Sequence, residues 1–180
     1  MVILGIDPGS RATGYGVVES RGGRLRPIAY GVVRPPGGSG FLDRLPHLET
    51  AINALLDRHA PEGVAIEDVF QARNSRAALL LGHARGVILL PALRRSLPVA
   101  TYAPRLVKKA VAGFGGAEKE QVRRMVRILL NLPREPLALD ASDALAVAIC
   151  HAHASALDPA CRIGASMSRH RGLPPRLRTA

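Results

Sequence analysis

Four acidic side chains have the types and positions needed to act together on a cation. Asp7 ends the first apolar stretch of the chain, and Glu67 ends another one sixty residues later. An unpaired carboxylate at the end of a buried strand is costly, so a nearby cation would explain its place. Asp140 and Asp143 lie in a later helical segment, where a spacing of three puts both on one face of the helix. The four carboxylates therefore define a candidate cation site.

Each of these residues also has a purely structural explanation. Asp140 and Asp143 could complement the dipole of a helix start or cap its free N–H groups. Glu67 could be an ordinary exposed strand end, and its neighbour Asp68 could be the functional acid instead. Because side chains alternate along a strand, only one of this pair can share a face with Asp7. The residues alone leave the choice between Glu67 and Asp68 open.

Convergence of these carboxylates would require cations to neutralise their mutual repulsion. Carboxylate and water oxygens suit Mg²⁺ or Mn²⁺ better than they suit zinc. Two such ions about 4 Å apart can activate a water molecule and stabilise the leaving oxygen in an in-line phosphoryl displacement. The pattern therefore predicts metal-dependent hydrolysis of a phosphodiester.

The formal net charge of +11 predicts a polyanionic partner, for which nucleic acid is the natural choice. The chain has no Trp and only three Phe and three Tyr, which argues against a protein that stacks single-stranded bases on aromatic rings. Its three lysines, Lys108, Lys109 and Lys119, fall within twelve residues of a chain that otherwise uses arginine. Chance clustering could explain this; the functional explanation is that compact ammonium groups are needed there.

The chain of 180 residues, 47% of them hydrophobic, is long enough for one domain with an adequate core. Three strands joined by short turns predict an antiparallel meander, after which strands and helices alternate. We therefore predict an α/β fold in which helices flank a five-stranded mixed sheet. The predicted strands are residues 2–7, 14–18, 28–33, 64–67 and 99–102, and the predicted helices are residues 41–59, 75–97, 104–111, 118–132 and 139–156.

Two features of this plan concern its boundaries. Pro91 should kink or divide the helix at 75–97, whose broad apolar stripe indicates burial either against a second copy of the protein or inside the fold. The predicted domain is residues 1–157. Residues 158–180 carry five arginines with little periodicity, so we expect a basic, disordered tail.

The expected location is a reducing cytoplasm. No run approaches the roughly 20 apolar residues of a membrane span, and the first residues show strand pattern without a basic leader. Two cysteines are too few for a disulfide framework, although a Cys150–Cys161 bridge is a minor alternative. Cys150, His151 and His153 include metal-ligand types, but a helix spreads them over different faces. We expect a packing cysteine and surface histidines there.

Four groups of short motifs stand out in chain order between residues 1 and 153. They are Gly5-Ile6-Asp7-Pro8-Gly9-Ser10 with Thr13-Gly14-Tyr15-Gly16, then Ala65-Ile66-Glu67-Asp68-Val69-Phe70, then Ala117-Glu118-Lys119, and finally Asp140-Ala141-Ser142-Asp143-Ala144-Leu145-Ala146. No single motif is decisive, but the ordered set is specific. It closely resembles the RuvC family of bacterial Holliday-junction resolvases.

This resemblance implies a ribonuclease H-like fold and a homodimer that makes paired, symmetric nicks in opposed strands of a four-way DNA junction. It implies Mg²⁺ as the cofactor, with Mn²⁺ also supporting activity, and ligatable 5′-phosphate ends. It further implies a role in recombination and repair beside the RuvA–RuvB branch-migration complex. It assigns metal binding and catalysis to Asp7, Glu67, Asp140 and Asp143, and so favours Glu67 over Asp68.

The resemblance also implies contacts with DNA. Lysines that match Lys108 and Lys119 lie near the catalytic site in the family, and we group both with the catalytic residues. An aromatic residue that matches Phe70 is associated with stacking on bases and opening the junction. Further predicted phosphate contacts are Arg76, Lys109 and Arg123.

Three other functions compete with this one. A YqgF-type nuclease that processes ribosomal RNA usually carries a lysine-arginine pair after the first Asp turn, where this chain reads Pro8-Gly9-Ser10-Arg11-Ala12. A junction-binding module without activity would not need four carboxylates. A sugar-kinase or actin-like ATP-binding fold opens in a similar way but needs two such domains, which 180 residues do not hold.

Overall fold

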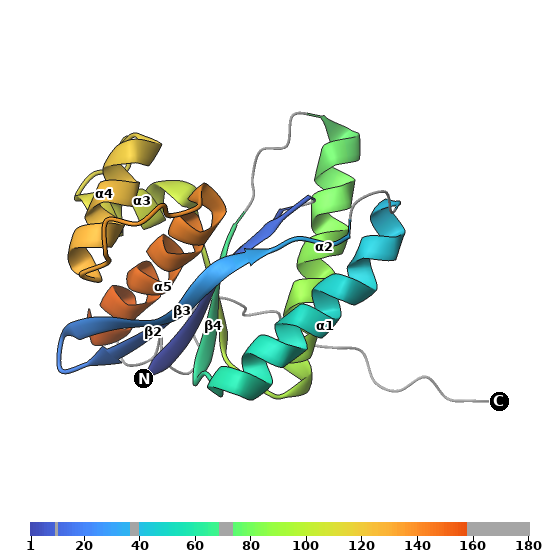
Figure 1. Ribbon diagram of the computed structural model, residues 1–180, viewed down its shortest axis with the longest axis horizontal. Coiled ribbons are helices and arrows are strands. Elements are labelled where there is room, and N and C mark those ends of the chain that lie inside the picture. The colour runs from blue at the N-terminus through green and yellow to red at the C-terminus, as the bar shows by residue number, and fades with distance from the viewer. Residues whose placement is uncertain (10, 37–39, 69–73, 158–180) are drawn as a thin grey trace, which may run out of the picture.

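A five-stranded mixed sheet lies between two helical layers in the computed structural model, which describes residues 1–9, 11–36, 40–68 and 74–157 (Figure 1). The strand order is β3-β2-β1-β4-β5, which confirms the predicted α/β fold with helices flanking a five-stranded mixed sheet. Phe70 and the predicted tail at 158–180 lie outside the described residues. The elements are β1 (Val2–Asp7), β2 (Thr13–Arg21), β3 (Arg24–Val33), α1 (Phe41–His59), β4 (Gly63–Glu67), α2 (Ser75–Arg94), β5 (Val99–Tyr102), α3 (Pro104–Ala112), α4 (Lys119–Leu129) and α5 (Leu139–Leu157).

Strand β1 is the centre of the sheet and joins its two halves. It pairs antiparallel with β2, where Asp7 lies opposite Gly14, and parallel with β4, where Ile6 lies opposite Ile66. Strands β2 and β3 complete the predicted meander, and β5 extends the parallel half. Because parallel strands end at the same edge, the register places the end of β1 directly beside the end of β4.

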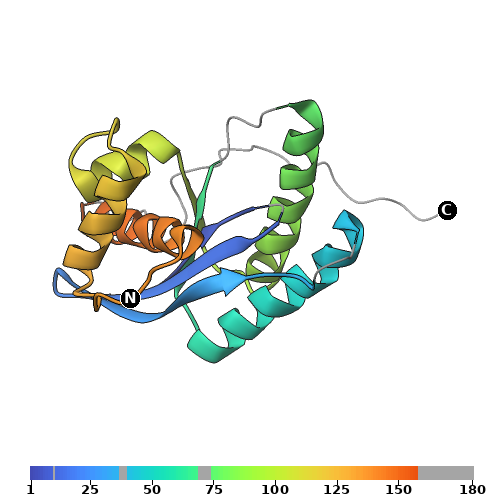
Figure 2. The ribbon, with the colours of Figure 1, turned by 45° about the horizontal axis from the view of Figure 1, so that its top comes forward.

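The two faces of the sheet are covered by different helices. Helices α3, α4 and α5 lie on one face, and α1 and α2 lie on the other (Figures 1 and 2). Successive side chains of β1 alternate between the two cores: Ile3 packs with α5, whereas Leu4 and Ile6 pack with α1 and α2. This alternation explains why β1 reads as a continuous apolar run, since both of its faces are buried.

Helix α5 is an internal element rather than a surface helix. It packs on β1 and β2, and α3 and α4 cover its other side (Figure 1). Twelve of its residues are buried, so it shows no polar face except at its first turns. A helix that is apolar all round is buried on all sides, and this one holds a fixed position against the sheet.

Several predicted boundaries were wrong. The helix predicted at 75–97 ends at Arg94, and Ser96 follows with φ of 56°; the helix predicted at 118–132 ends at Leu129, before Asn131 with φ of 48°. Residues in this left-handed conformation cannot continue a right-handed helix. Pro91 does not divide α2, which is continuous on both sides of it. Pro91 is itself one of the buried residues of this helix.

The expectation that no run of the chain is long and apolar enough to span a membrane also needs correction. Helix α2, with 20 residues and a mean hydropathy of 1.3, is long and apolar enough to cross a membrane by length and composition alone. In this fold, however, Ala84, Ile88 and Ala92 of α2 are part of the core.

The prediction of surface histidines was wrong for His151. This side chain is buried and hydrogen-bonded to the Tyr102 hydroxyl at 2.8 Å from Nδ1, and burial lowers its pKa. Cys150 is buried and free, as expected for a packing residue, and burial raises the pKa of its thiol to about 12. His153 is half-buried, with Nδ1 3.2 Å from the Ala110 carbonyl oxygen.

Candidate active site

Asp7 and Glu67 end adjacent parallel strands and face the same side of the sheet. Ile6 pairs with Ile66, so the next residue of each strand lies beside that of the other. Asp7 shares its face with Ile3, and Glu67 shares its face with Ala65, which both pack against α5. The two carboxylates therefore point toward the helix that carries Asp140 and Asp143.

Asp68 lies on the opposite face of the sheet. Its Oδ1 accepts a hydrogen bond of 2.8 Å from Nη1 of Arg85 on α2. Because this ion pair holds Asp68 on the α2 side, the geometry separates it from Asp7. Strand alternation at the end of β4 therefore puts Glu67, and not Asp68, on the same face of the sheet as Asp7.

Glycines in β1 and β2 bring the start of α5 close to Asp7. A Cβ atom on Gly14 would lie 1.9 Å from the carbonyl oxygen of Asp140, and one on Gly5 would lie 2.2 Å from that of Ala144. A Cβ on Gly16 would meet the side chain of Leu145 at 2.7 Å. Backbone and helix can approach this closely only because these strand positions have no side chain. These glycines belong to the motifs noted in the sequence, but the motifs alone did not predict this packing role. A glycine inside an apolar strand is the signal that could have predicted it.

A cleft of about 250 Å³ opens beside Glu67 and Asp143, between the sheet edge and helices α3, α4 and α5. Two of the predicted lysines line it: Lys108 from α3 and Lys119 from the first turn of α4. Nζ of Lys119 lies 3.6 Å from Oδ2 of Asp143. The remaining lining residues are Pro104, Val107, Val122 and Ala146.

Burial and neighbouring negative charges raise the pKa of three carboxylates in this cluster. Burial, which is the largest cause, and the negative charges of Glu67, Asp143 and Asp140 together raise the pKa of Asp7 to about 8, while the charge of Lys119 opposes them. Asp140 is therefore close enough for its charge to act on Asp7, although neither residue is among those that line the cleft. The group is short of positive charge when no metal ion is present.

Glu67 and Asp143 respond in the same way. Burial raises the pKa of Glu67 to about 7, helped by the charge of Asp143 and opposed by Lys119 and Lys108. Burial also raises the pKa of Asp143, against the opposing positive charge of Lys119. Acids whose pKa values are raised by burial and by neighbouring charges, at or beside a cleft, are typical of functional sites.

The donor set fits a hard divalent cation. All the acidic groups offer oxygen atoms, with no sulfur or imidazole ligand among them. In the part of the chain that the structure describes, no three such groups form a ready-made metal cage. Mg²⁺ usually keeps several waters and binds proteins through one or two carboxylates together with substrate phosphates.

The remaining predicted DNA contacts are spread around this cleft. Arg76 is exposed in the first turn of α2, and Lys109 is exposed on α3 without lining the described cleft. Arg123 on α4 forms an ion pair of 2.8 Å with Glu120. Phe70 falls outside the described residues. The structure thus brings Lys108 and Lys119 to the carboxylates and leaves Arg76, Lys109 and Arg123 outside the cleft lining.

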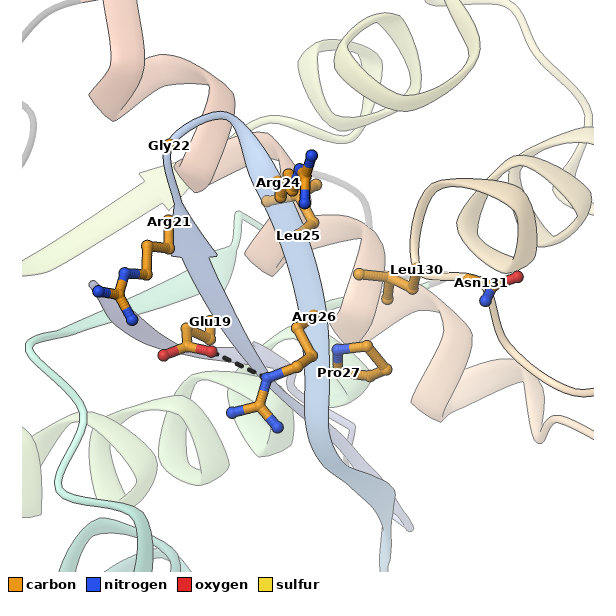
Figure 3. Close-up of a pocket in the computed structure, with 9 residues that line it drawn as sticks. All are labelled: Glu19, Arg21, Gly22, Arg24, Leu25, Arg26, Pro27, Leu130 and Asn131. Carbon is orange, nitrogen blue, oxygen red and sulfur yellow. Dashed lines mark hydrogen bonds and ion pairs between the residues drawn. The ribbon is translucent and has the colours of Figure 1, made fainter.

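A second, more open pocket of about 810 Å³ lies at the far end of the sheet (Figure 3). The β2–β3 hairpin supplies Arg21, Arg24 and Arg26 to it, and Arg26 pairs with Glu19 at 2.9 Å. Glu19 lies opposite Val2 in the register, which is the end of β1 farthest from Asp7. The pocket is therefore separate from the carboxylate cluster.

Ser142, between the two aspartates of α5, provides a test of local packing. Its hydroxyl is buried and has no hydrogen-bond partner among the described residues. Because an unsatisfied buried polar group costs about 1–3 kcal/mol, Ser142→Ala should stabilise the protein and raise its melting temperature by about 2–4 °C per kcal/mol gained. Calorimetry of the two proteins measures this, and a lower melting temperature for the variant would show that the hydroxyl is satisfied in solution.

Comparison with known proteins shows the family to which this chain is similar. The sequence model of the family described as crossover junction endodeoxyribonuclease RuvC matches residues 3–151. A protein of that name from Moorella thermoacetica is 52% identical over 152 residues, which cover 84% of this chain and 91% of that protein. Another from Heliobacterium modesticaldum is 50% identical over 162 residues, covering 90% of this chain and 100% of that one.

The fold gives the same result. The structure of RuvC from Thermus thermophilus in complex with Holliday junction substrate matches with a TM-score of 0.81 and 36% identity, covering 92% of this chain and 97% of that one. The architecture is thus that of a ribonuclease H-like nuclease. The chain belongs to the RuvC family of crossover junction endodeoxyribonucleases. Membership implies dependence on a divalent metal ion, in agreement with the donor set, and does not favour the YqgF-type alternative.

Proposed function

We propose that this protein resolves Holliday junctions by paired, symmetric nicks in two opposed strands, using Mg²⁺ bound by Asp7, Glu67, Asp140 and Asp143. The observation that carries the proposal is the cluster of mutually repelling carboxylates beside Lys108 and Lys119. The relative from Thermus thermophilus, whose structure contains a Holliday junction substrate, supports the choice of DNA.

Each group has a task in this proposal. When bound, divalent ions activate a water molecule and stabilise the charge on the leaving oxygen. Asp7 and Glu67 supply oxygen ligands from rigid strand ends, and Asp140 and Asp143 supply them from the fixed start of α5. The lysines at the cleft, Lys108 and Lys119, hold the scissile phosphate against the carboxylates by charge.

Cut-site mapping on a synthetic mobile four-way junction tests this function. With Mg²⁺ or Mn²⁺ we expect symmetric nicks in opposed strands, 5′-phosphate ends, and no comparable cutting of linear duplex. Precursor ribosomal RNA in a parallel reaction tests the YqgF-type alternative. A junction that is bound but never cut with either metal would instead support the non-catalytic binding module.

The wider DNA-binding surface follows from charge. We propose that Arg76, Lys109 and Arg123 contact phosphates beyond the cleft and that Phe70 stacks on bases at the junction. Arg76 and Lys109 are exposed, which leaves their charges accessible to phosphate. The basic tail at 158–180 remains a prediction, as do assistance by the RuvA–RuvB complex and a cytoplasmic location.

We also propose a homodimer formed through α2. The outer face of this helix exposes Leu79, Leu90 and Leu93, with exposed fractions of 60%, 42% and 56%. Gly82 and Gly86 lie on the same face, and a Cβ atom on either would meet nothing within 4 Å. An apolar stripe with glycines four residues apart lets a second helix approach closely, as in small-residue helix contacts.

A charge placed on this face should break the dimer. We expect Leu90→Arg to convert the wild-type dimer into a monomer at micromolar concentration, because burying an unpaired charge in the interface is costly. Sedimentation equilibrium measures the change. Leu42→Arg on α1, at a leucine that is 68% exposed, is the matched control and should remain dimeric. A monomeric wild type, or a dimeric Leu90→Arg variant, would contradict the proposed interface.

A further inference from the structure

Arg85 of α2 binds the end of the strand that carries Glu67, from the face of the sheet opposite the cleft. Its Nη1 donates to the backbone carbonyl of Glu67 at 3.0 Å and to Oδ1 of Asp68 at 2.8 Å. Its Nη2 donates to the hydroxyl of Thr101 on β5 at 3.2 Å. One guanidinium group therefore binds three acceptors: one on the last residue of β4, one on the residue after it, and one on the adjacent parallel strand β5.

These contacts lie where the backbone ladder of β4 ends. Glu67 pairs with Tyr102, and the backbone N–H of Asp68 donates to the Tyr102 carbonyl at 2.8 Å. The peptide unit between Glu67 and Asp68 is thus held at its carbonyl by Arg85 and at its N–H by β5. With this peptide fixed, the Cα–Cβ bond of Glu67 has a fixed direction toward the α5 side of the sheet.

The ion pair between Arg85 and Asp68 is partly buried. The side chains of Arg85 and Asp68 are only 22% and 29% exposed, so solvent screens their ion pair less than it screens the surface pairs of the same helix. The pair between Arg94 and Glu49, for comparison, has side chains that are 65% and 39% exposed. The planar fork of arginine can serve three acceptors in fixed directions, whereas the ammonium group of lysine is a point charge without this geometry.

We propose that Arg85 is a positioning residue for metal binding: it fixes the strand end from which Glu67 reaches the metal. This inference rests on the proposed role of Glu67 as a metal ligand. Groups that orient a metal ligand without touching the metal commonly change metal affinity or activity by about 10–100-fold when they are replaced. Arg85 acts through the backbone of Glu67 and through Asp68, and none of these contacts lies inside the cleft.

Direct Mn²⁺ binding to the DNA-free protein provides the test. We expect Arg85→Lys to weaken Mn²⁺ binding, measured by calorimetry or electron paramagnetic resonance, by about tenfold. The Mn²⁺ concentration for half-maximal junction cleavage should rise by a similar factor, with junction affinity little changed. Arg94→Lys, an arginine of the same helix whose ion pair is exposed, is the matched control and should behave as wild type.

Asp68→Asn is the second variant, because it keeps the shape of the side chain and an acceptor for Arg85 while removing the charge. It should shift Mn²⁺ binding in the same direction by a smaller factor. Measurements are made well below the melting temperature of each variant, on protein whose circular dichroism matches wild type. If folded Arg85→Lys and Asp68→Asn both bind Mn²⁺ as wild type does, Arg85 only stabilises the fold and the inference is overturned.

A Glu67→Gln variant separates this inference from the function on which it rests. If Glu67→Gln weakens Mn²⁺ binding strongly while Arg85→Lys does not, the proposed function survives and the positioning role fails. If Glu67→Gln binds Mn²⁺ as tightly as wild type, Glu67 is not a metal ligand, and both the assignment of Glu67 and the role of Arg85 fail together. Weakened binding in both variants supports both statements.

Discussion

Asp7→Asn should abolish cleavage of a four-way junction while the variant still binds the junction. Asp7 lies at the centre of the carboxylate cluster, where the charges of Glu67, Asp143 and Asp140 all act on it. Losing its charge should remove several kcal/mol of transition-state stabilisation from the metal site, and every 1.36 kcal/mol is tenfold in rate. We therefore expect the rate to fall by about a thousandfold or more in single-turnover assays with Mg²⁺.

The same substitution should make the metal-free protein more stable. Burial and neighbouring charges raise the pKa of Asp7 from 3.8 to about 8, so the folded protein holds this proton more tightly than the unfolded chain. The associated stability is fully present below about pH 4 and is lost as the pH rises toward 8. With EDTA present, Asp7→Asn should therefore melt several degrees above wild type at pH 8, and the difference should shrink toward pH 5. Added Mg²⁺ should raise the melting temperature of wild type more than that of the variant.

Two controls make these outcomes decisive. Asp57→Asn removes an exposed carboxylate of α1 that pairs with Arg95, and it should keep the wild-type cleavage rate. Gel shifts in Ca²⁺ or EDTA measure junction binding without turnover. Cleavage by Asp7→Asn near the wild-type rate would overturn the metal assignment. An unchanged melting curve at pH 8 would show that the charge of Asp7 does not destabilise the metal-free protein.

Gly14→Ala should disrupt the active site by pushing α5 away from β2. The added Cβ would lie 1.9 Å from the carbonyl oxygen of Asp140 and 2.4 Å from its carbonyl carbon, so backbone must move. Overpacking of this kind costs about 1–3 kcal/mol or more, which corresponds to a fall in melting temperature of about 2–4 °C per kcal/mol. Because the displaced turn carries Asp140 and Asp143, cleavage by the folded variant should fall as well, by about tenfold or more for a displacement approaching 1 Å.

Gly116→Ala is the matched control for this substitution. The nearest atom to its added Cβ would be 3.7 Å away, which is ordinary contact, so stability and cleavage should stay close to wild type. Thermal melts and single-turnover cleavage of both variants give the comparison. Wild-type stability and rate in Gly14→Ala would show that α5 can shift without disturbing the carboxylates. This result would contradict the claim that the close approach of α5 to Gly14 positions Asp140 and Asp143.

The sequence contained enough to predict the layers and the acidic residues. Apolar runs with period two and apolar stripes at helical spacing indicate strands and helices whatever the rest of the chain does, because they record which faces are buried. Turns such as Gly22-Gly23, both at positive φ, are local as well, although the hairpin strands β2 and β3 reach this turn and are longer than predicted. The helix ends that were missed, at Ser96 and Asn131, depend on a backbone conformation that neither residue requires.

The sequence by itself determined which residues are candidates for the site. They are an aspartate and a glutamate that end apolar strands, two aspartates three residues apart, and three lysines within twelve residues. Only the tertiary structure decided that Glu67 faces α5 while Asp68 binds Arg85, that His151 is buried, and that glycines admit the start of α5 to the sheet. The reason is physical: residue types and their periods are local properties. The distance between the strand end at Glu67 and the helix that begins at Leu139 is set by packing between elements, which no local pattern records.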